Sequence, residues 1–504
     1  MSHLKIFGLG FGIFLCASFA IAASGYNQPP KEILDVMQAP DIPYGRTNPT
    51  KDRMFLVSVQ NYPSIERVAE PFLRLAGVRI EQGNHSRHDA AGGNGIPKCV
   101  QSFSIVTIAD GTEKKIDISK LACMDHPEWS ADGKNFFFKN KTAKSVELWI
   151  GDAKTAKISR IPNVKINPML GDDVQWMPLQ KSLLVKMIPK NLGTAPKVEQ
   201  NFIGPSIQLS VGEKGQSSTY EKRDTLKNKN DEMLFDYYAQ SQLALIDIKS
   251  KKVTLLGKPD LYDSVEVAPD NNSILTTKIV RPYSYLVTYF RFPHKVEVLD
   301  IKNPNKIATT LIADLPLAER VPIHGVPTGP RGFRWHPLDP ATLIWAEALD
   351  GGDWNNKVPY RDKVMMLAAP FKDEAKELFK VEQRYSGLAW TEKRDTALLY
   401  EYNHNLHWVK TFIVNPDKPE QRPQTLFDMS SEEEYKNPGD PVYKTLSNGY
   451  SVIRYNQNAI FLSGQGSSPE GDRPFLDKLD LVTRKTERLF RSSKTELERF
   501  MSFP

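Results

Sequence analysis

The clearest indication of the fold is the stretch HPEWSADGKNFFFKNKTAKSVELWIGDAKTAKISRI, residues 126–161. It contains a tryptophan, a turn at Asp132-Gly133, and then short apolar segments that polar turns separate. The segment VELWIGD alternates apolar and polar residues with a period of two, which is typical of a strand with one buried face. Short alternating strands joined by turns predict an antiparallel meander.

The same arrangement recurs along most of the chain. An irregular first unit and five later units repeat the pattern of paired strand segments separated by Asp, Gly, Asn, Lys and Pro. With residues 126–161 this makes seven units of roughly 40 to 85 residues, which indicates a repeat architecture. The other six units occupy residues 51–118, 174–257, 265–312, 332–381, 385–427 and 447–491.

Sheets of this kind cannot bury both faces alone, so several must pack against one another. Radial packing of about seven four-stranded antiparallel sheets predicts an all-β protein, a β-propeller over residues 46–504, with an eight-bladed ring as the alternative. Separate β-sandwiches would need long linkers, and only GEKGQSSTYEKRDTLKNKNDE, residues 212–232, has such a character. The polar composition of this tract predicts a mobile insertion within one blade.

The N-terminus MSHLKIFGLGFGIFLCASFAIAASG has the layout of a secretory signal peptide. One lysine precedes an apolar run from Ile6 to Ala20, and a small-x-small cleavage pattern follows. We expect residues 1–23 to be removed and the mature protein to be periplasmic or secreted. No later apolar run reaches the length of a spanning helix, so we expect no membrane anchor. Residues 24–45 form an N-terminal segment with helical spacing of Ile33, Leu34 and Met37.

Two cysteines remain after such a leader, Cys99 and Cys123. An exported protein permits a disulfide between them, which would constrain the unfolded chain by roughly 3 kcal/mol. Two free thiols in neighbouring strands are the alternative. No Cys/His spacing in the sequence supports a zinc site, and we expect no metal.

The charges exclude some classes of function. The chain has 66 basic and 60 acidic residues, a net charge of +6, and the surplus is scattered rather than clustered. A scattered surplus is typical of a mixed solvated surface and does not predict nucleic-acid binding. The sequence has no G-x-S-x-G elbow, P-loop or dinucleotide fingerprint, so neither a nucleophile nor a cofactor is predicted.

Two histidine pairs resemble metal ligands in residue type only. His85 and His88 lie in HSRH, and His404 and His407 lie in HNLH. A spacing of three on a strand directs two rings to opposite faces, so we interpret all four as surface histidines. Four tryptophans near the start of repeat units are interpreted as core residues rather than carbohydrate platforms; these are Trp129, Trp176, Trp335 and Trp390.

Four arginines lie beside aromatic and turn-forming residues. Salt bridges within blades are the plainer interpretation. The alternative is that some of them point into a central cavity and bind an acidic group, since a guanidinium fork matches a carboxylate. The four candidates are Arg281, Arg291, Arg334 and Arg384.

Several segments together resemble the amino-terminal half of the glutamyl endopeptidase branch of the prolyl oligopeptidase superfamily. They occur in that family's order over nearly the whole mature chain. The segments are PPKEILDVMQAP (29–40), FLRLAGVRIE (72–81), EMLFDYYAQSQLAL (232–245), RPYSYLVTYFRFPHKVEVLD (281–300), LPLAERVPI (315–323), IWAEALDGGD (344–353), RYSGLAW (384–390), LFDMSSEEEY (426–435) and GSSPEGDRPFLDKLDL (466–481).

The resemblance implies a propeller that gates peptide access to an α/β-hydrolase domain with a Ser-His-Asp triad. Such enzymes cleave after glutamate. No catalytic position of that domain is present in this sequence, so we expect no peptidase activity from this chain alone, and a hydrolase domain is its expected partner. Ser467 and Ser468 are expected to be turn residues.

Three accounts of the chain are open: a fragment of a longer product, a truncated product, or a free-standing propeller. Two functional hypotheses follow. The chain is either the peptide-gating half of a serine endopeptidase or an independent propeller that binds peptides or proteins.

Overall fold

The computed structural model describes residues 29–37, 39, 42–60, 62–90, 95–198 and 223–503. The chain divides into two compact units, residues 1–42 and residues 43–504. The first contains helix α1 (Lys31–Met37), which confirms the predicted short helix. The predicted leader, residues 1–23, lies outside the described residues. No helix in the described ranges combines the length and hydropathy that a membrane span requires.

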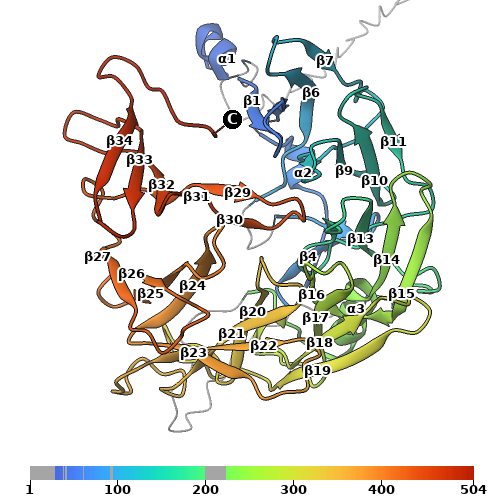
Figure 1. Cartoon of the computed structure of the whole chain (residues 1–504). Coiled ribbons are helices and arrows are strands. Elements are labelled where there is room, and N and C mark those ends of the chain that lie inside the picture. Colours follow the sequence, from blue (N-terminus) through green and yellow to red (C-terminus); the bar gives the residue numbers. More distant parts are fainter. Residues whose placement is uncertain are drawn as a thin grey trace, which may run out of the picture. The chain divides into compact units, whose positions relative to one another are not determined.

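The second unit contains seven consecutive antiparallel sheets, the blades, arranged around a ring (Figure 1). Blade one has β1 (Tyr44–Thr47), β2 (Arg53–Val59), β6 (Val100–Thr107) and β7 (Glu113–Lys115). Blade two has β8 (Glu128–Trp129), β9 (Asn135–Lys141), β10 (Val146–Asp152) and β11 (Ile158–Arg160). Blade three has β12 (Val174–Trp176), β13 (Ser182–Met187), β14 (Ser241–Asp247) and β15 (Val253–Asp260). Blade four has β16 (Tyr262–Val267), β17 (Ser273–Ile279), β18 (His294–Asp300) and β19 (Ala308–Leu315).

The last three blades follow the same order. Blade five has β20 (Pro330–Trp335), β21 (Thr342–Ala348), β22 (Asp362–Ala368) and β23 (Lys376–Val381). Blade six has β24 (Arg384–Trp390), β25 (Ala397–Asn403), β26 (Trp408–Val414) and β27 (Gln424–Ser430). Blade seven has β28 (Asp440–Pro441), β31 (Tyr455–Asn456), β32 (Ala459–Gly464), β33 (Phe475–Asp480) and β34 (Thr486–Arg491). The all-β propeller prediction is confirmed, with seven blades rather than eight, and the first strand begins two residues before the predicted boundary.

Apolar clusters fill the six interfaces between consecutive blades. Between blades one and two, for example, Trp129 stacks on Phe55 with ring centroids 3.6 Å apart. Trp335 and Trp390 are buried in later interfaces, and Trp176 packs against the second. The tryptophans are therefore core residues, as predicted, because each ends or nearly ends an inner strand where two blades meet.

Blades one and seven meet differently. In the described part of the chain no apolar cluster joins them; a hollow of about 590 Å³ lies between them, and Lys51, Asp440 and Arg454 are among its lining residues. No strand is exchanged either, since the first sheet uses residues 44–115 and the last uses residues 440–491. The chain end covers part of this seam, where Phe503 packs against Phe461 with ring centroids 4.6 Å apart.

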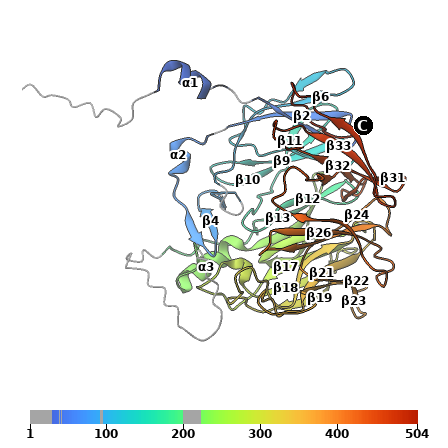
Figure 2. The same ribbon diagram turned by 90° about the vertical axis from the view of Figure 1, so that its left-hand side faces the viewer.

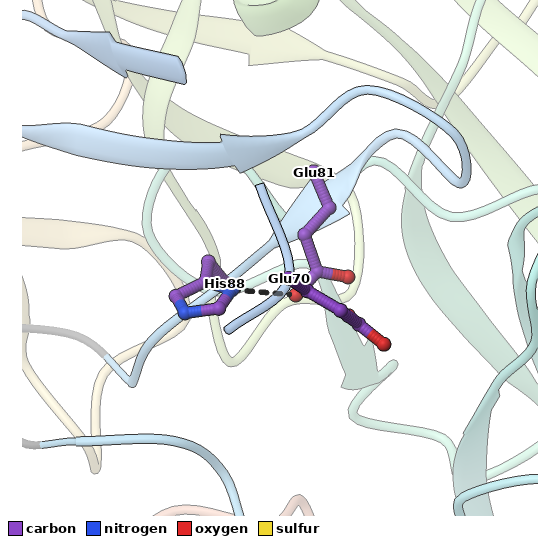
Figure 3. Close-up of side chains that lie close together, drawn as sticks. All are labelled: Glu70, Glu81 and His88. Carbon is purple, nitrogen blue, oxygen red and sulfur yellow. Dashed lines mark hydrogen bonds and ion pairs between the residues drawn. The ribbon is translucent and has the colours of Figure 1, made fainter. Parts of the chain in front are cut away.

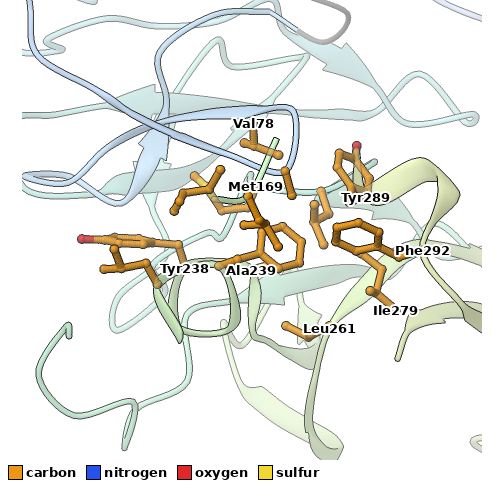
Figure 4. Close-up of a cluster of buried hydrophobic side chains, with 14 of the residues drawn as sticks. Val78, Met169, Tyr238, Ala239, Leu261, Ile279, Tyr289 and Phe292 are labelled. Carbon is orange, nitrogen blue, oxygen red and sulfur yellow. The ribbon is translucent and has the colours of Figure 1, made fainter. Parts of the chain in front are cut away.

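Three insertions build an accessory layer on one side of the ring, the insertion side (Figure 2). They lie between β2 and β6, β13 and β14, and β17 and β18. The layer contains α2 (Ile65–Val68), the sheet β3 (Leu73–Leu75), β4 (Val78–Glu81) and β5 (Ser86–Arg87), helix α3 (Lys229–Ala239) and the 3-10 turn η2 (Tyr289–Arg291). Figure 4 shows its apolar core, in which Val78, Tyr238, Tyr289 and Phe292 converge from different insertions.

Helix α3 corrects one sequence prediction. Residues 212–222 of the predicted mobile tract lie outside the described residues, but its last residues are ordered. Asn228 caps α3 by accepting a hydrogen bond from the Asp231 amide, and Glu232 is buried. The polar tract orders here because Glu232 finds partners far away in the sequence, which composition alone does not reveal.

Candidate functional site

A large cavity lies at the centre of the ring. Its volume is about 1420 Å³, larger than the few hundred to about 1,000 Å³ of a small-molecule pocket. Residues from blades one to five line it, together with a hairpin that leaves blade seven. A cavity of this size can hold an extended segment of several residues.

Charged side chains divide between the walls of this cavity. The acidic residues come mostly from blades two to four, and the basic ones from blades one and five and the connection before blade five. The acidic set is Glu128, Asp172, Asp263, Glu266 and Glu319, and the basic set is Arg46, Lys51, Arg320, Arg331 and Arg334. A bound peptide would meet opposite potentials on opposite walls, which favours one orientation.

Arg331 and Arg334 form the basic wall of blade five. A spacing of three on a regular strand would direct them to opposite faces. The strand β20 contains a β-bulge, however, so Arg331 pairs with Ala346 and Arg334 with Ile344, two residues apart on β21. Gly332 permits the bulge with a φ of +66°. The two guanidinium groups therefore come to the same cavity.

A buried ion network supports this wall from behind. Arg384 bonds Asp350 at 2.6 Å and Asp362 at 3.0 Å. Arg331 also bonds Asp362, at 2.5 Å, and Arg361 bonds Asp350, at 2.9 Å. Three arginines face two aspartates, so the network holds one surplus positive charge, and Nη1 of Arg331 has no hydrogen-bond partner among the described residues.

Glu266 faces this basic wall from blade four. Burial raises the pKa of its carboxyl to about 7, while the charge of Arg334 and a hydrogen bond with Tyr450 act in the opposite direction. Tyr450 belongs to the hairpin from blade seven, and its hydroxyl donates to the backbone carbonyl of Val267. The cavity therefore contains a carboxyl group that changes charge near neutral pH.

The structure separates the four predicted arginines. Only Arg334 lines the central cavity, where its side chain is exposed. Arg281 bonds Glu232 and Asp236 of α3 in the accessory layer, the latter at 2.6 Å. Arg291 ends η2 outside the cavity lining, and burial lowers the pKa of its guanidinium. Arg384 is a buried member of the blade-five network, so salt bridges explain Arg281 and Arg384.

A second cluster of ionisable groups lies in the accessory layer. Glu70, Glu81 and His88 bring ligand atoms within 4.8 Å of one another (Figure 3). Arg67 bonds both Glu70, at 2.6 Å, and Glu81, at 2.5 Å, and Lys141 bonds Glu81 at 2.7 Å. Two cationic side chains already neutralise the two carboxylates, so the cluster is an ion-pair network rather than a metal site.

The prediction of surface histidines was wrong for one pair. His85 and His88 are buried, because α3 and Phe72 cover the turn that carries them. His85 bonds the carbonyl of Tyr238 at 2.9 Å, and His88 bonds Glu81 at 3.1 Å. His404 and His407 are exposed, as predicted.

Ser467 and Ser468 lie in the loop between β32 and β33. Ser468 donates to the carbonyl of Gly471 at 2.7 Å and accepts from the amide of Glu470. Ser467 donates to Asp472 at 3.3 Å. Both serines hold a turn, as the sequence predicted.

Two curated plant proteins match nearly the whole chain. "Probable glutamyl endopeptidase, chloroplastic" from Oryza sativa subsp. japonica is 35% identical over 495 residues, which is 94% of this chain and 51% of the rice protein. Nearly the whole chain is thus similar to about half of a protein named as a glutamyl endopeptidase. The protein of the same name from Arabidopsis thaliana is 34% identical over 496 residues, 94% of this chain and 50% of its own length. The family resemblance read from the sequence is thus confirmed, and the chain spans about half the length of these endopeptidases.

Solved structures show a more distant likeness. A prolyl endopeptidase is 11% identical with a TM-score of 0.45, covering 90% of this chain and 50% of its own. The β-propeller domain of the trilobed protease from Pyrococcus furiosus is 10% identical with a TM-score of 0.38, covering 90% of this chain and 95% of that domain. No protein-family model matches the chain. The fold assignment rests on the seven sheets themselves.

Sequence reasoning missed several cavity residues. Arg331 stands in the same segment as Arg334, PRGFRW, and the glycine between them was a usable sign of a bulge. Glu266 and Tyr450 gave no local signal, because they meet only when the hairpin of blade seven reaches blade four.

Proposed function

We propose that this chain is the non-catalytic, substrate-gating propeller part of an exported serine endopeptidase resembling glutamyl endopeptidase. In this proposal the central cavity holds a peptide, and an α/β-hydrolase part supplies the serine, histidine and aspartate. The main support for this proposal is the central cavity, in which acidic and basic side chains lie on different walls. The chain that forms it matches about half of each endopeptidase relative.

Arg334 is proposed to bind the acidic group of the peptide. Its side chain is exposed to the cavity, and no hydrogen bond or ion pair holds its guanidinium in the described part of the chain. Arg331 adds positive charge beside it, while its own bond to Asp362 fixes its position. A free guanidinium backed by a fixed one favours a carboxylate over a neutral amide.

The test is a binding titration of the purified chain with two labelled decapeptides that differ only in one glutamate or glutamine. Arg334→Ala should weaken binding of the glutamate peptide by about 1 to 3 kcal/mol, roughly five- to 150-fold in Kd. Binding of the glutamine peptide should change little. Arg422→Ala, at an exposed arginine outside the cavity lining, is the matched control. Equal effects on both peptides would remove Arg334 from this role.

A free-standing binding propeller is the second candidate function. The two candidates differ in the DNA that follows the coding sequence: the first expects a G-x-S-x-G segment in some reading frame, and the second does not. For the purified chain, the first proposal expects no hydrolysis of glutamyl peptides. Serine-inhibitor-sensitive turnover by the chain alone would contradict the non-catalytic assignment.

Export is proposed from two features. The N-terminal residues have the layout of a signal peptide, and the structure joins Cys99 to Cys123 in a disulfide. Disulfides persist in oxidising compartments, so a periplasmic or secreted location suits this bond. Cell fractionation tests this location. Recovery of the protein only from the cytoplasm, with residues 1–23 still attached, would contradict it.

A further inference from the structure

A hairpin inserted into blade seven crosses the ring. It comprises β29 (Tyr443–Thr445) and β30 (Ser451–Ile453), which form a two-stranded sheet separate from the sheets of the blades. We call residues 443–453 the cross-ring hairpin. Figure 1 shows it leaving the last blade and running into the middle of the ring.

The base of this hairpin is fixed to blade six. Ile453 forms a parallel bridge with Thr391, and Lys444 bonds Glu392. Val452 and Ile453 are buried in the apolar clusters on either side of blade six. An apolar base with backbone pairing holds the root of the hairpin firmly, so movement is confined to its tip.

The tip, residues 446–450, reaches the opposite wall. Tyr450 donates its hydroxyl proton to the carbonyl of Val267 in blade four, and Gly449 lies beside the amide of Gln180 in blade three. Gln180 in turn accepts from the amide of Ala131 in blade two at 2.7 Å.

These contacts all lie where inner strands end and turn outward, the turn side of the ring. The backbone amide of Leu179 donates to the side-chain oxygen of Asn271 at 3.2 Å, and the backbone amide of Asp270 donates to the carbonyl of Pro340 at 2.7 Å. The turns of blades three, four and five are therefore linked there. The accessory layer arises from the opposite ends of the strands. The hairpin tip and the accessory layer therefore lie at different ends of the cavity.

We propose that the cross-ring hairpin is a latched strap that closes the turn-side end of the central cavity, with Tyr450 as the latch. The cavity is then a cup with its entrance on the insertion side, and residues 448–450 limit how deeply a ligand can enter. This deepens the proposed function, because the occupant of the cup is the peptide proposed there.

The latch depends on one proton of Glu266. The neutral carboxyl can donate to the oxygen of Tyr450, whose own proton goes to Val267, so every group is satisfied. After ionisation, the carboxylate and the carbonyl compete for the single hydroxyl proton. The charged groups facing Glu266 and Tyr450 are Arg334 on β20, Asp172 before β12, and Asp270 in the turn after β16.

The direction of the pH dependence follows from the raised pKa of Glu266. Burial is the largest cause of this raised pKa, and closure of the strap buries the carboxyl; burial therefore favours closure at low pH, although the hydrogen bond with Tyr450 acts in the opposite direction. That contribution is complete below the ordinary carboxyl pKa and is lost as the pH rises through about 7. The strap should therefore loosen between about pH 5 and 8.

Hydrogen exchange at the tip tests the latch. The amides of Leu446 and Gly449 donate within the tip, at 2.7 and 2.9 Å, and report its order. Tyr450→Phe, which keeps the ring and removes the hydroxyl, should lower their protection factors at least about tenfold. Tyr443→Phe, on the exposed strand of the same hairpin, is the matched control and should leave them unchanged. Equal protection in all three proteins would overturn the latch.

A second arm tests the proton. Protection factors, corrected for the intrinsic pH dependence of exchange, should fall between pH 5 and 8 in the natural chain and stay level in Glu266→Gln. A fall of equal size in Glu266→Gln would overturn the role of this carboxyl. Peptide binding is measured on the same proteins. Absence of binding would refute the proposed function, whereas the hydrogen-exchange data alone test whether the hairpin is a latched strap.

Discussion

Arg334 and Arg384 differ in their surroundings more than in their sequence context. Both adjoin aromatic residues in strand segments, yet Arg384 bonds two buried aspartates while Arg334 is exposed in the cavity. An arginine with buried ionic partners serves stability. An exposed arginine on a concave wall is available to a ligand.

Arg384→Ala should lower the free energy of unfolding by about 1.5 to 3 kcal/mol, because Asp350 and Asp362 each lose a buried charged hydrogen bond, although Arg361 and Arg331 still neutralise them. Arg334→Ala should change it by less than about 0.5 kcal/mol. Urea unfolding of both variants measures the difference. Similar losses for the two substitutions would contradict the distinction between them.

Two buried histidines make the fold sensitive to acid. Burial lowers the pKa of His85 and of His336 to about 4. The unfolded chain binds protons at these sites near pH 6.5, before the folded chain does, so stability falls as the pH drops from about 6.5 to 4. Each site should contribute up to about 3 kcal/mol to this fall.

The acid effect is measured as the slope of unfolding free energy against pH. His85→Gln keeps a donor for the carbonyl of Tyr238 and should reduce the slope between pH 6.5 and 4. His407→Gln, at an exposed position, should not. An unchanged slope in His85→Gln would show that this ring titrates alike in both states.

At the scale of elements, local sequence patterns predicted the blades well. Residues 126–161 became blade two because alternation and turn residues act over a few positions, and β9 and β10 pair within that stretch. Helix α3 and the cross-ring hairpin were not predicted. The order of α3 depends on the bond from Glu232 to Arg281, and the hairpin depends on Tyr450 reaching Val267. Such contacts join residues far apart in sequence and leave no periodic signal.

The disulfide ties blade one to blade two. Cys99 precedes β6, Cys123 precedes β8, and the bond closes a separation of 24 residues. Replacing both cysteines by serine should lower the unfolding free energy by about 3 kcal/mol, since the unfolded chain regains that loop's freedom. Denaturant unfolding with and without reductant checks this. Reductant should lower the unfolding free energy of the natural chain and leave that of the double variant unchanged. An equal change in both proteins would contradict a stabilising disulfide.

In the molecule as a whole, we expect the seam between blades one and seven to be the weakest interface of the ring. Six interfaces have apolar clusters, whereas a polar hollow of about 590 Å³ lies at the seam. Amides of β2 and β32 should therefore exchange faster than those of β13, β17 and β21, by at least about tenfold. Hydrogen exchange of the whole chain measures this. Uniform protection in all seven blades would contradict a weak seam.

We propose that the ring encloses a peptide-binding cup that holds acidic peptides without cleaving them. The most direct measurement is a calorimetric titration of the purified chain with the glutamate and glutamine decapeptides, followed by recovery of the peptides. We expect saturable binding that favours the glutamate peptide, loss of this preference in Arg334→Ala, and recovery of intact peptide. Failure to bind either peptide, or recovery of cleaved peptide, would contradict it.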